Sequence, residues 1–128
     1  MNSLNRGHVT VTVGAVAATK EIGVIQAHKK MIVRNLSIVD VAAIAASGAN
    51  YVTYGAKVNN VSVGTAVDTQ LGLAARSDKA IVMPSDGLTN DNGITLEKGD
   101  FLSVDLTVTG TGALTNAGIH ADIEIVGN

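Results

Sequence analysis

The last third of the chain alternates apolar and polar residues in two separate runs. From Leu102 to Val108 the apolar residues take the even positions, and from Ile119 to Ile125 they take the odd positions. Because successive side chains of a strand point to opposite faces, each run has one face for a core and one for solvent. The glycine-containing segment 110–118 between the runs is loop-like. The pattern predicts two antiparallel strands of a β-sandwich, with His120, Asp122 and Glu124 facing outward.

Earlier segments also have strand character. Their β-branched residues suit a pleated, half-buried surface. The expected strands are Val9–Val13, Met31–Val41, Tyr51–Val63, Ala80–Met83 and Ile94–Leu96. In the second of these the apolar parity shifts between Ile38 and Val39, which predicts a bulge there. In the third, Asn59-Asn60 predicts a tight turn, because Asn tolerates positive φ.

Two segments are ambiguous or helical. Residues 15–28 fit either two helical turns or a loop with a short strand, and Gly23 with Val24-Ile25 favours the strand. Residues 65–79 carry Leu71, Ala74 and Ala75 at helical spacing and form the one expected helix. About eight short strands with no repeated strand–helix alternation predict an antiparallel sandwich or barrel.

Size and charge limit the classes of function. The chain of 128 residues is long enough for one domain, which we place at residues 9–128 behind a polar N-terminal arm at residues 1–8. A net charge of −2 predicts no nucleic-acid partner. The longest uncharged stretch is too short and polar to cross a membrane, and Met1–His8 has no apolar core for a secretory signal.

Motifs for chemistry are weak throughout. The three histidines lie in separate segments, and none has a second metal ligand two residues away. Segment 86–93 has the composition of a calcium loop, but it lacks the carboxylates that an EF-hand needs at its first and last positions. An irregular calcium site and a plain turn both remain open for it. We expect no enzyme activity, no cofactor, no metal site and no small-molecule substrate.

The segment Val41–Asn50 is apolar, small and uncharged, although it connects two predicted strands. Such a segment is either a strand end buried in the core or a contact surface for a partner.

Several motifs follow the order found in a known group of proteins. They are the strand of residues 30–39, the small loop 42–49, residues 50–54, the Glu97-Lys98-Gly99-Asp100 turn with its following strand, and Thr109-Gly110-Thr111-Gly112. Over residues 22–126 this order resembles small jelly-roll proteins of tailed bacteriophage virions, especially head decoration or cement proteins.

The resemblance implies an antiparallel jelly-roll-like β-sandwich of about eight strands with at most one short helix. It also implies a homotrimer on the capsid surface, bound to the major capsid protein and made in the host cytoplasm without a signal peptide. The family has no catalytic residues to transfer. The candidate contacts, from the arm, the apolar segment and the tyrosines, are Asn2, Leu4, Arg6, Val41, Ala42, Ala43, Ile44, Ala45, Tyr51 and Tyr54.

The alternative is a receptor- or glycan-binding β-sandwich of a phage tail fibre or tail tip. Sugar-binding surfaces usually need exposed aromatic rings, and the candidates are Tyr51 and Tyr54. Their opposite parity prevents both from facing one sugar in a regular strand.

Overall fold

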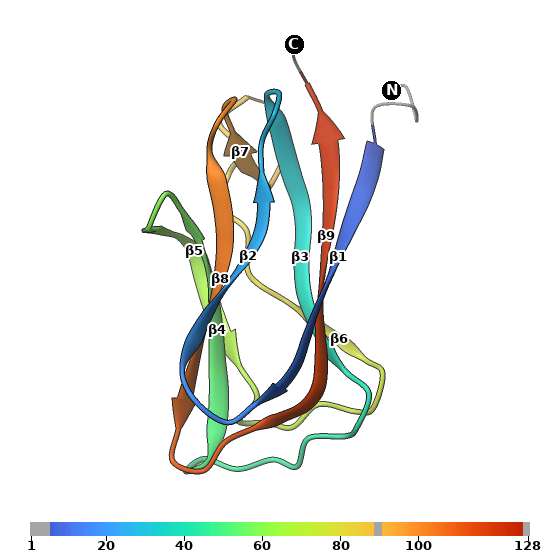
Figure 1. Ribbon diagram of the computed structural model, residues 1–128, viewed down its shortest axis with the longest axis vertical. Coiled ribbons are helices and arrows are strands. Elements are labelled where there is room, and N and C mark those ends of the chain that lie inside the picture. Colours follow the sequence, from blue (N-terminus) through green and yellow to red (C-terminus); the bar gives the residue numbers. More distant parts are fainter. Residues whose placement is uncertain (1–5, 89–90, 127–128) are drawn as a thin grey trace.

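The structure is a computed structural model that describes residues 6–88 and 91–126. Within these residues it contains nine strands and no helix, and Figure 1 shows the strands in two facing layers. The first sheet consists of β1 (Arg6–Val16), β9 (Leu114–Ile125), β3 (Met31–Asp40), and the short strands β6 (Asp78–Ala80) and β7 (Ile94–Leu96). The second sheet consists of β2 (Lys20–Gln26), β8 (Phe101–Thr109), β4 (Tyr51–Val58) and β5 (Val61–Asp68).

The strand order is that of a jelly roll. In the first sheet the order is β1-β9-β3, with β6 and β7 paired one after the other along the remaining edge of β3. In the second sheet the order is β2-β8-β4-β5. The chain changes sheet at every connection except β4–β5 and β6–β7, and every strand pair is antiparallel. The predicted antiparallel, jelly-roll-like β-sandwich is therefore confirmed.

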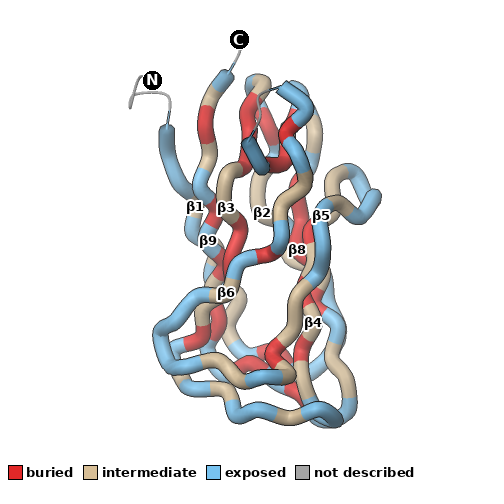
Figure 2. Tube along the Cα trace, turned by 180° about the vertical axis from the view of Figure 1, so that it is seen from behind, coloured by how far each residue is buried: buried red, intermediate tan, exposed pale blue. Residues whose placement is uncertain are grey.

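The core lies between the two sheets and is built by the alternating runs. Leu102, Leu106, Ile119 and Ala121 are fully buried, as the parity of the last third of the chain predicts. Figure 2 marks the buried positions, many of which lie along β3, β4, β8 and β9. The aliphatic interior also receives the ring of Tyr54, whose hydroxyl donates a hydrogen bond to the carbonyl of Lys79 at 2.9 Å.

The predicted helix at residues 65–79 is wrong. Residues up to Asp68 belong to β5, and the chain then turns irregularly before β6. Gly72 and Arg76 have φ values of 84° and 59°, which an α-helix does not allow. The spacing of Leu71, Ala74 and Ala75 instead belongs to an exposed loop.

Three smaller expectations also need correction. β1 begins at Arg6, so residues 6–8 of the predicted arm are part of a strand. The bulge of β3 against β9 lies between Val33 and Asn35, because the charged Arg34 leaves the regular register there. Residues 81–83 form only an isolated bridge, in which Val82 pairs with Thr65.

Two ambiguous or local predictions are confirmed. Residues 20–26 form a strand, the favoured reading of the ambiguous segment. Asn59 and Asn60 make the tight β4–β5 turn with φ values of 50° and 69°.

Candidate functional site

Four connections meet at one end of the sandwich, at the bottom of Figure 1. They join β1 to β2, β3 to β4, β5 to β6, and β8 to β9. We call the β3–β4 loop (residues 41–50) and the β5–β6 loop (residues 69–77) together the loop platform. The two loops lie side by side, because Ile44 and Leu73 exchange two backbone hydrogen bonds of 2.7 and 2.9 Å.

The loop platform presents apolar side chains to solvent. Leu71 is 88% exposed and is the most exposed large hydrophobic residue of the described chain, and Val41 is 45% exposed. The same two loops carry exposed alanines, at positions 43, 45, 46, 74 and 75. Most of the segment 41–50 is therefore at the surface, which excludes the interpretation as a strand end buried in the core.

A buried carboxylate holds the platform to the sheets. Asp40, at the end of β3, is 1% exposed and accepts hydrogen bonds from the backbone N–H groups of Ala42, Thr115 and Asn116 at 3.0, 2.7 and 3.2 Å. Its own carbonyl accepts from the N–H of Arg76 at 2.8 Å. One residue thus connects β3, β9 and both loops of the platform.

The neighbouring β8–β9 turn is packed closely against the start of β4. Asn50 accepts a hydrogen bond on Oδ1 from the N–H of Thr111 at 2.9 Å. A Cβ at Gly112 would lie 2.2 Å from the carbonyl oxygen of Tyr51, so a larger residue cannot occupy that position without a shift of the backbone. The platform therefore rests on a support whose hydrogen bonds and close contacts fix its shape.

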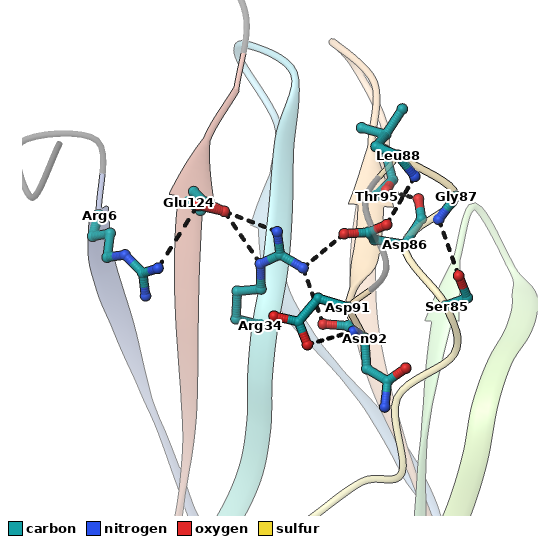
Figure 3. Close-up of polar contacts among 10 residues, drawn as sticks. All are labelled: Arg6, Arg34, Ser85, Asp86, Gly87, Leu88, Asp91, Asn92, Thr95 and Glu124. Carbon is teal, nitrogen blue, oxygen red and sulfur yellow. Dashed lines mark hydrogen bonds and ion pairs between the residues drawn. The ribbon is translucent and has the colours of Figure 1, made fainter. Parts of the chain in front are cut away.

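A second cluster, of polar residues, lies on the first sheet in the half that is farther from the loop platform (Figure 3). Arg34 donates hydrogen bonds through Nη2 and Nε to Glu124 of β9 and through Nη1 to Asp86 of the β6–β7 connection, at 2.9, 3.2 and 2.8 Å. The Asp86 side chain is completely buried, and Arg6 of β1 approaches Glu124 at 3.8 Å. Glu124, predicted to face solvent, is largely buried because this guanidinium is its partner.

The charges of this cluster stabilise one another. Burial acts to lower the pKa of Arg34, but the hydrogen bonds and charges of Glu124 and Asp86 outweigh burial and raise the pKa above its ordinary value.

The cluster also bears on the calcium hypothesis for segment 86–93. The positive charge beside Asp86 is the guanidinium of Arg34, which a cation would have to displace.

The candidate contact residues do not gather at one place. Val41, Ala42, Ala43, Ile44 and Ala45 lie on the loop platform, whereas Arg6 lies at the other end of the sandwich. Asn2 and Leu4 lie outside the described residues. Leu71 was missed by sequence reasoning, because its spacing with the following alanines favoured a helix.

The tyrosines give little support to a glycan-binding surface. Tyr54 is fully buried, which corrects its assignment as a contact residue, and Tyr51 is half-buried. A hollow of about 510 Å³ on the outer face of the first sheet has no Tyr, Trp or Phe in its lining, which consists of Arg6, Gly7, His8, Arg34, Asn35, Asp122 and Ile123.

Within residues 6–88 and 91–126, no group of three or more His, Cys, Asp or Glu side chains is arranged to hold a metal ion. The same part of the chain contains no helix of the length and apolar character that crossing a membrane requires.

Against known proteins, the sequence matches no protein-family model and has no significant match among curated proteins.

Proposed function

We propose that the protein is a structural virion subunit that binds the outside of a phage capsid through its loop platform. In this role it acts as a decoration or cement protein, and its partner is the major capsid protein. The observation that carries the proposal is the exposed apolar surface around Leu71 and Val41 on a closely supported pair of loops. Exposed apolar surface marks sites of protein–protein contact where it forms a patch.

The support beneath the platform matters for affinity. A partner that binds flexible loops must order them, and that ordering reduces the free energy of binding. Here Asp40 and the Ile44–Leu73 bridge already fix both loops. The resemblance to phage decoration proteins supplies the identity of the partner, and the jelly-roll topology agrees with that resemblance.

The chemistry of the platform agrees with a partner surface of low charge. Most exposed side chains of the platform are aliphatic, and the exposed polar ones are Asn50, Arg76 and Ser77. Arg76 is the one charged residue of the platform. Burial of aliphatic surface contributes about 25 cal/mol per Å². Affinity should therefore depend on Leu71, the largest exposed apolar side chain, more than on salt.

The test is cosedimentation of the purified protein with DNA-free heads of the phage that encodes it. Leu71→Asp places a charge in the proposed contact and should weaken binding by about tenfold or more. The matched control is Val61→Asp, which changes an exposed valine outside the platform, at the first position of β5, and should leave binding unchanged. Both variants should keep the β-sheet circular dichroism spectrum.

Two results would contradict the proposal. One is failure of the wild-type protein to sediment with heads at micromolar concentration. The other is equal binding by wild type and Leu71→Asp, which would place the contact elsewhere on the molecule.

A further inference from the structure

The edges of the two sheets differ in how well they are closed. The outer edge of β5 is covered at Thr65, which exchanges two backbone hydrogen bonds with Val82 at 2.9 and 3.2 Å. The edge beside β3 ends in β6 and β7, which have three residues each. Short or covered edges of this kind resist pairing with another chain.

The remaining two edges belong to β1 and β2. β2 has a register shift between Gly23 and Ile25 and carries charges at Lys20 and Glu21, both of which hinder further pairing. β1 is eleven residues long and keeps a regular register against β9 from Arg6 to Thr12. Among the described strands, β1 pairs with β9 along one edge only. The other edge of β1 is therefore the longest regular edge open to a further strand.

The side chains of β1 divide cleanly between its two faces. Thr10 and Thr12 are exposed on the outer face, and Val9 and Val11 are half-buried at the margin of the core. A strand added beside β1 would cover the valines further only if it also placed apolar side chains on the inner face. The repeating sequence Val9-Thr10-Val11-Thr12 meets this condition for itself.

We propose that a second copy of this chain binds here, with β1 antiparallel to β1 around a two-fold axis at Thr10. In this register Thr10 faces Thr10 of the second copy, Val9 faces its Val11, and His8 faces its Thr12. Threonine pairs and aliphatic pairs directly opposite one another stabilise antiparallel strands. The backbone groups along the open edge gain partners at the same time.

Charge does not oppose this register. Arg6 comes opposite Gly14 of the second copy, a residue without a side chain, and no like charges face each other across the axis. Because the same patch serves both copies, the interface closes at two subunits. The predicted assembly is a dimer, whereas the resemblance to decoration proteins implies a trimer.

The dimer is independent of capsid binding. The β1 edge runs along the side of the sandwich and the loop platform lies at one end, so either contact can form without the other. Head binding with a monomeric protein would refute the dimer alone, and a dimer that ignores heads would refute the capsid proposal alone.

The first experiment uses the absence of cysteine from the chain. Directly opposite residues of antiparallel strands have Cα atoms about 4.5–5.5 Å apart, which suits a disulfide. Under mild oxidation Thr10→Cys should form a covalent dimer in high yield. The control, Thr107→Cys, changes an exposed threonine of the central strand β8 and should remain monomeric on a non-reducing gel.

The second experiment measures mass by size exclusion with light scattering. Wild type and Thr107→Arg should have the mass of two chains. Thr10→Arg should have the mass of one chain, because the substitution places two positive charges opposite each other in the proposed interface. Thr10 is exposed, so the Thr10→Arg subunit should keep its fold, checked by circular dichroism. A monomeric or trimeric wild type, or equal cross-linking of the two cysteine variants, would overturn the proposal.

Discussion

At the scale of single residues, the loop platform depends on Asp40. This carboxylate accepts three backbone hydrogen bonds from two separate segments, Ala42 on one side and Thr115-Asn116 on the other. Hydrogen bonds to a charged acceptor are stronger than neutral ones. The position of the platform relative to β9 is therefore set by one side chain.

Replacement of Asp40 by alanine should lower the free energy of unfolding by about 3 kcal/mol, because it leaves N–H groups without their acceptor. Asp40→Asn keeps one acceptor oxygen and should lose less. Urea unfolding followed by circular dichroism measures both. Asp122→Ala, an exposed carboxylate on β9, is the control and should stay close to wild type; an equally small effect at Asp40 would contradict its role.

Tyr54 should make the protein sensitive to alkali. Burial, and then the charges of Asp68 and Asp78, raise the pKa of its hydroxyl above the ordinary value. The folded protein thus holds this proton more tightly than the unfolded chain, whose tyrosines ionise near pH 10. The stability from Tyr54 is complete below that pH and falls as the pH rises above it.

Tyr54→Phe removes the ionisable group together with its bond to Lys79. At neutral pH the variant should be less stable than wild type by about 1 kcal/mol. Above about pH 10 this deficit should shrink by up to about 1.4 kcal/mol per pH unit. Urea midpoints at about pH 8 and about pH 11 measure the change; a deficit that stays constant or grows would refute the assignment.

At the scale of the elements, the Arg34 cluster joins three segments that are distant in sequence. Arg34 on β3 bonds to Glu124 on β9 and to Asp86 in the connection between β6 and β7. Figure 3 shows the guanidinium between the two carboxylates. Because the Asp86 side chain is completely buried, its charge depends on this partner.

Arg34→Met should destabilise the protein by about 3 kcal/mol or more, because it removes the guanidinium from the buried Asp86 and leaves Glu124 with only the more distant Arg6. The triple variant Arg34→Met, Asp86→Leu, Glu124→Leu removes the uncompensated charges and should recover part of the loss. Chemical unfolding of the three proteins, wild type included, gives the comparison. If the triple variant were less stable than Arg34→Met alone, the charge explanation would fail.

The β8–β9 turn tests the close packing beside the platform. Gly112→Ala brings a methyl group against the backbone of Tyr51 and should cost about 2 kcal/mol or more of unfolding free energy. Gly48→Ala, in the β3–β4 loop, has no heavy atom within 4 Å of the new methyl group and is the matched control. Thermal melts of the two variants should therefore diverge, and coincident melts would contradict this packing.

Alternation in the sequence predicted the strands best where one face is buried. Each of the runs at 102–108 and 119–125 keeps its own parity, and the inward residues are either buried or packed partly buried against the core. The same rule wrongly placed Glu124 in solvent, because alternation predicts only the face to which a side chain points. It cannot show that a residue of another strand, here Arg34, covers the carboxylate. The bulge at Arg34 escaped prediction for the same reason.

The helix prediction failed for a local reason. Residues 65–79 have helical spacing of apolar side chains, but the loop needs positive φ at Gly72 and Arg76 to pass beneath Ile44. That requirement comes from the neighbouring loop and is not visible in the segment itself. The apolar composition of 41–50 did indicate half of the candidate site, and Leu71 in the other half gave no such signal.

At the scale of the whole molecule, the jelly roll separates two surfaces. The loop platform forms one end of the sandwich, and β1 begins and β9 ends near the opposite end (Figure 1). A subunit that binds the capsid through the platform has the strands of its sandwich running away from the capsid surface. The turns at residues 27–30, 59–60 and 97–100 then point outward. The open edge of β1 then lies along the side of the bound subunit. Because the proposed pairing is antiparallel, a second copy bound there has its platform at the end away from the shell.

The orientation of the bound subunit tests this account most directly. Cryo-electron microscopy of phage heads saturated with the protein would resolve which end of the sandwich meets the shell. We predict that density for the loop platform, with Leu71 and Val41, lies against the major capsid protein. A shell contact made only through the opposite end of the sandwich, with no platform against the major capsid protein, would contradict the account.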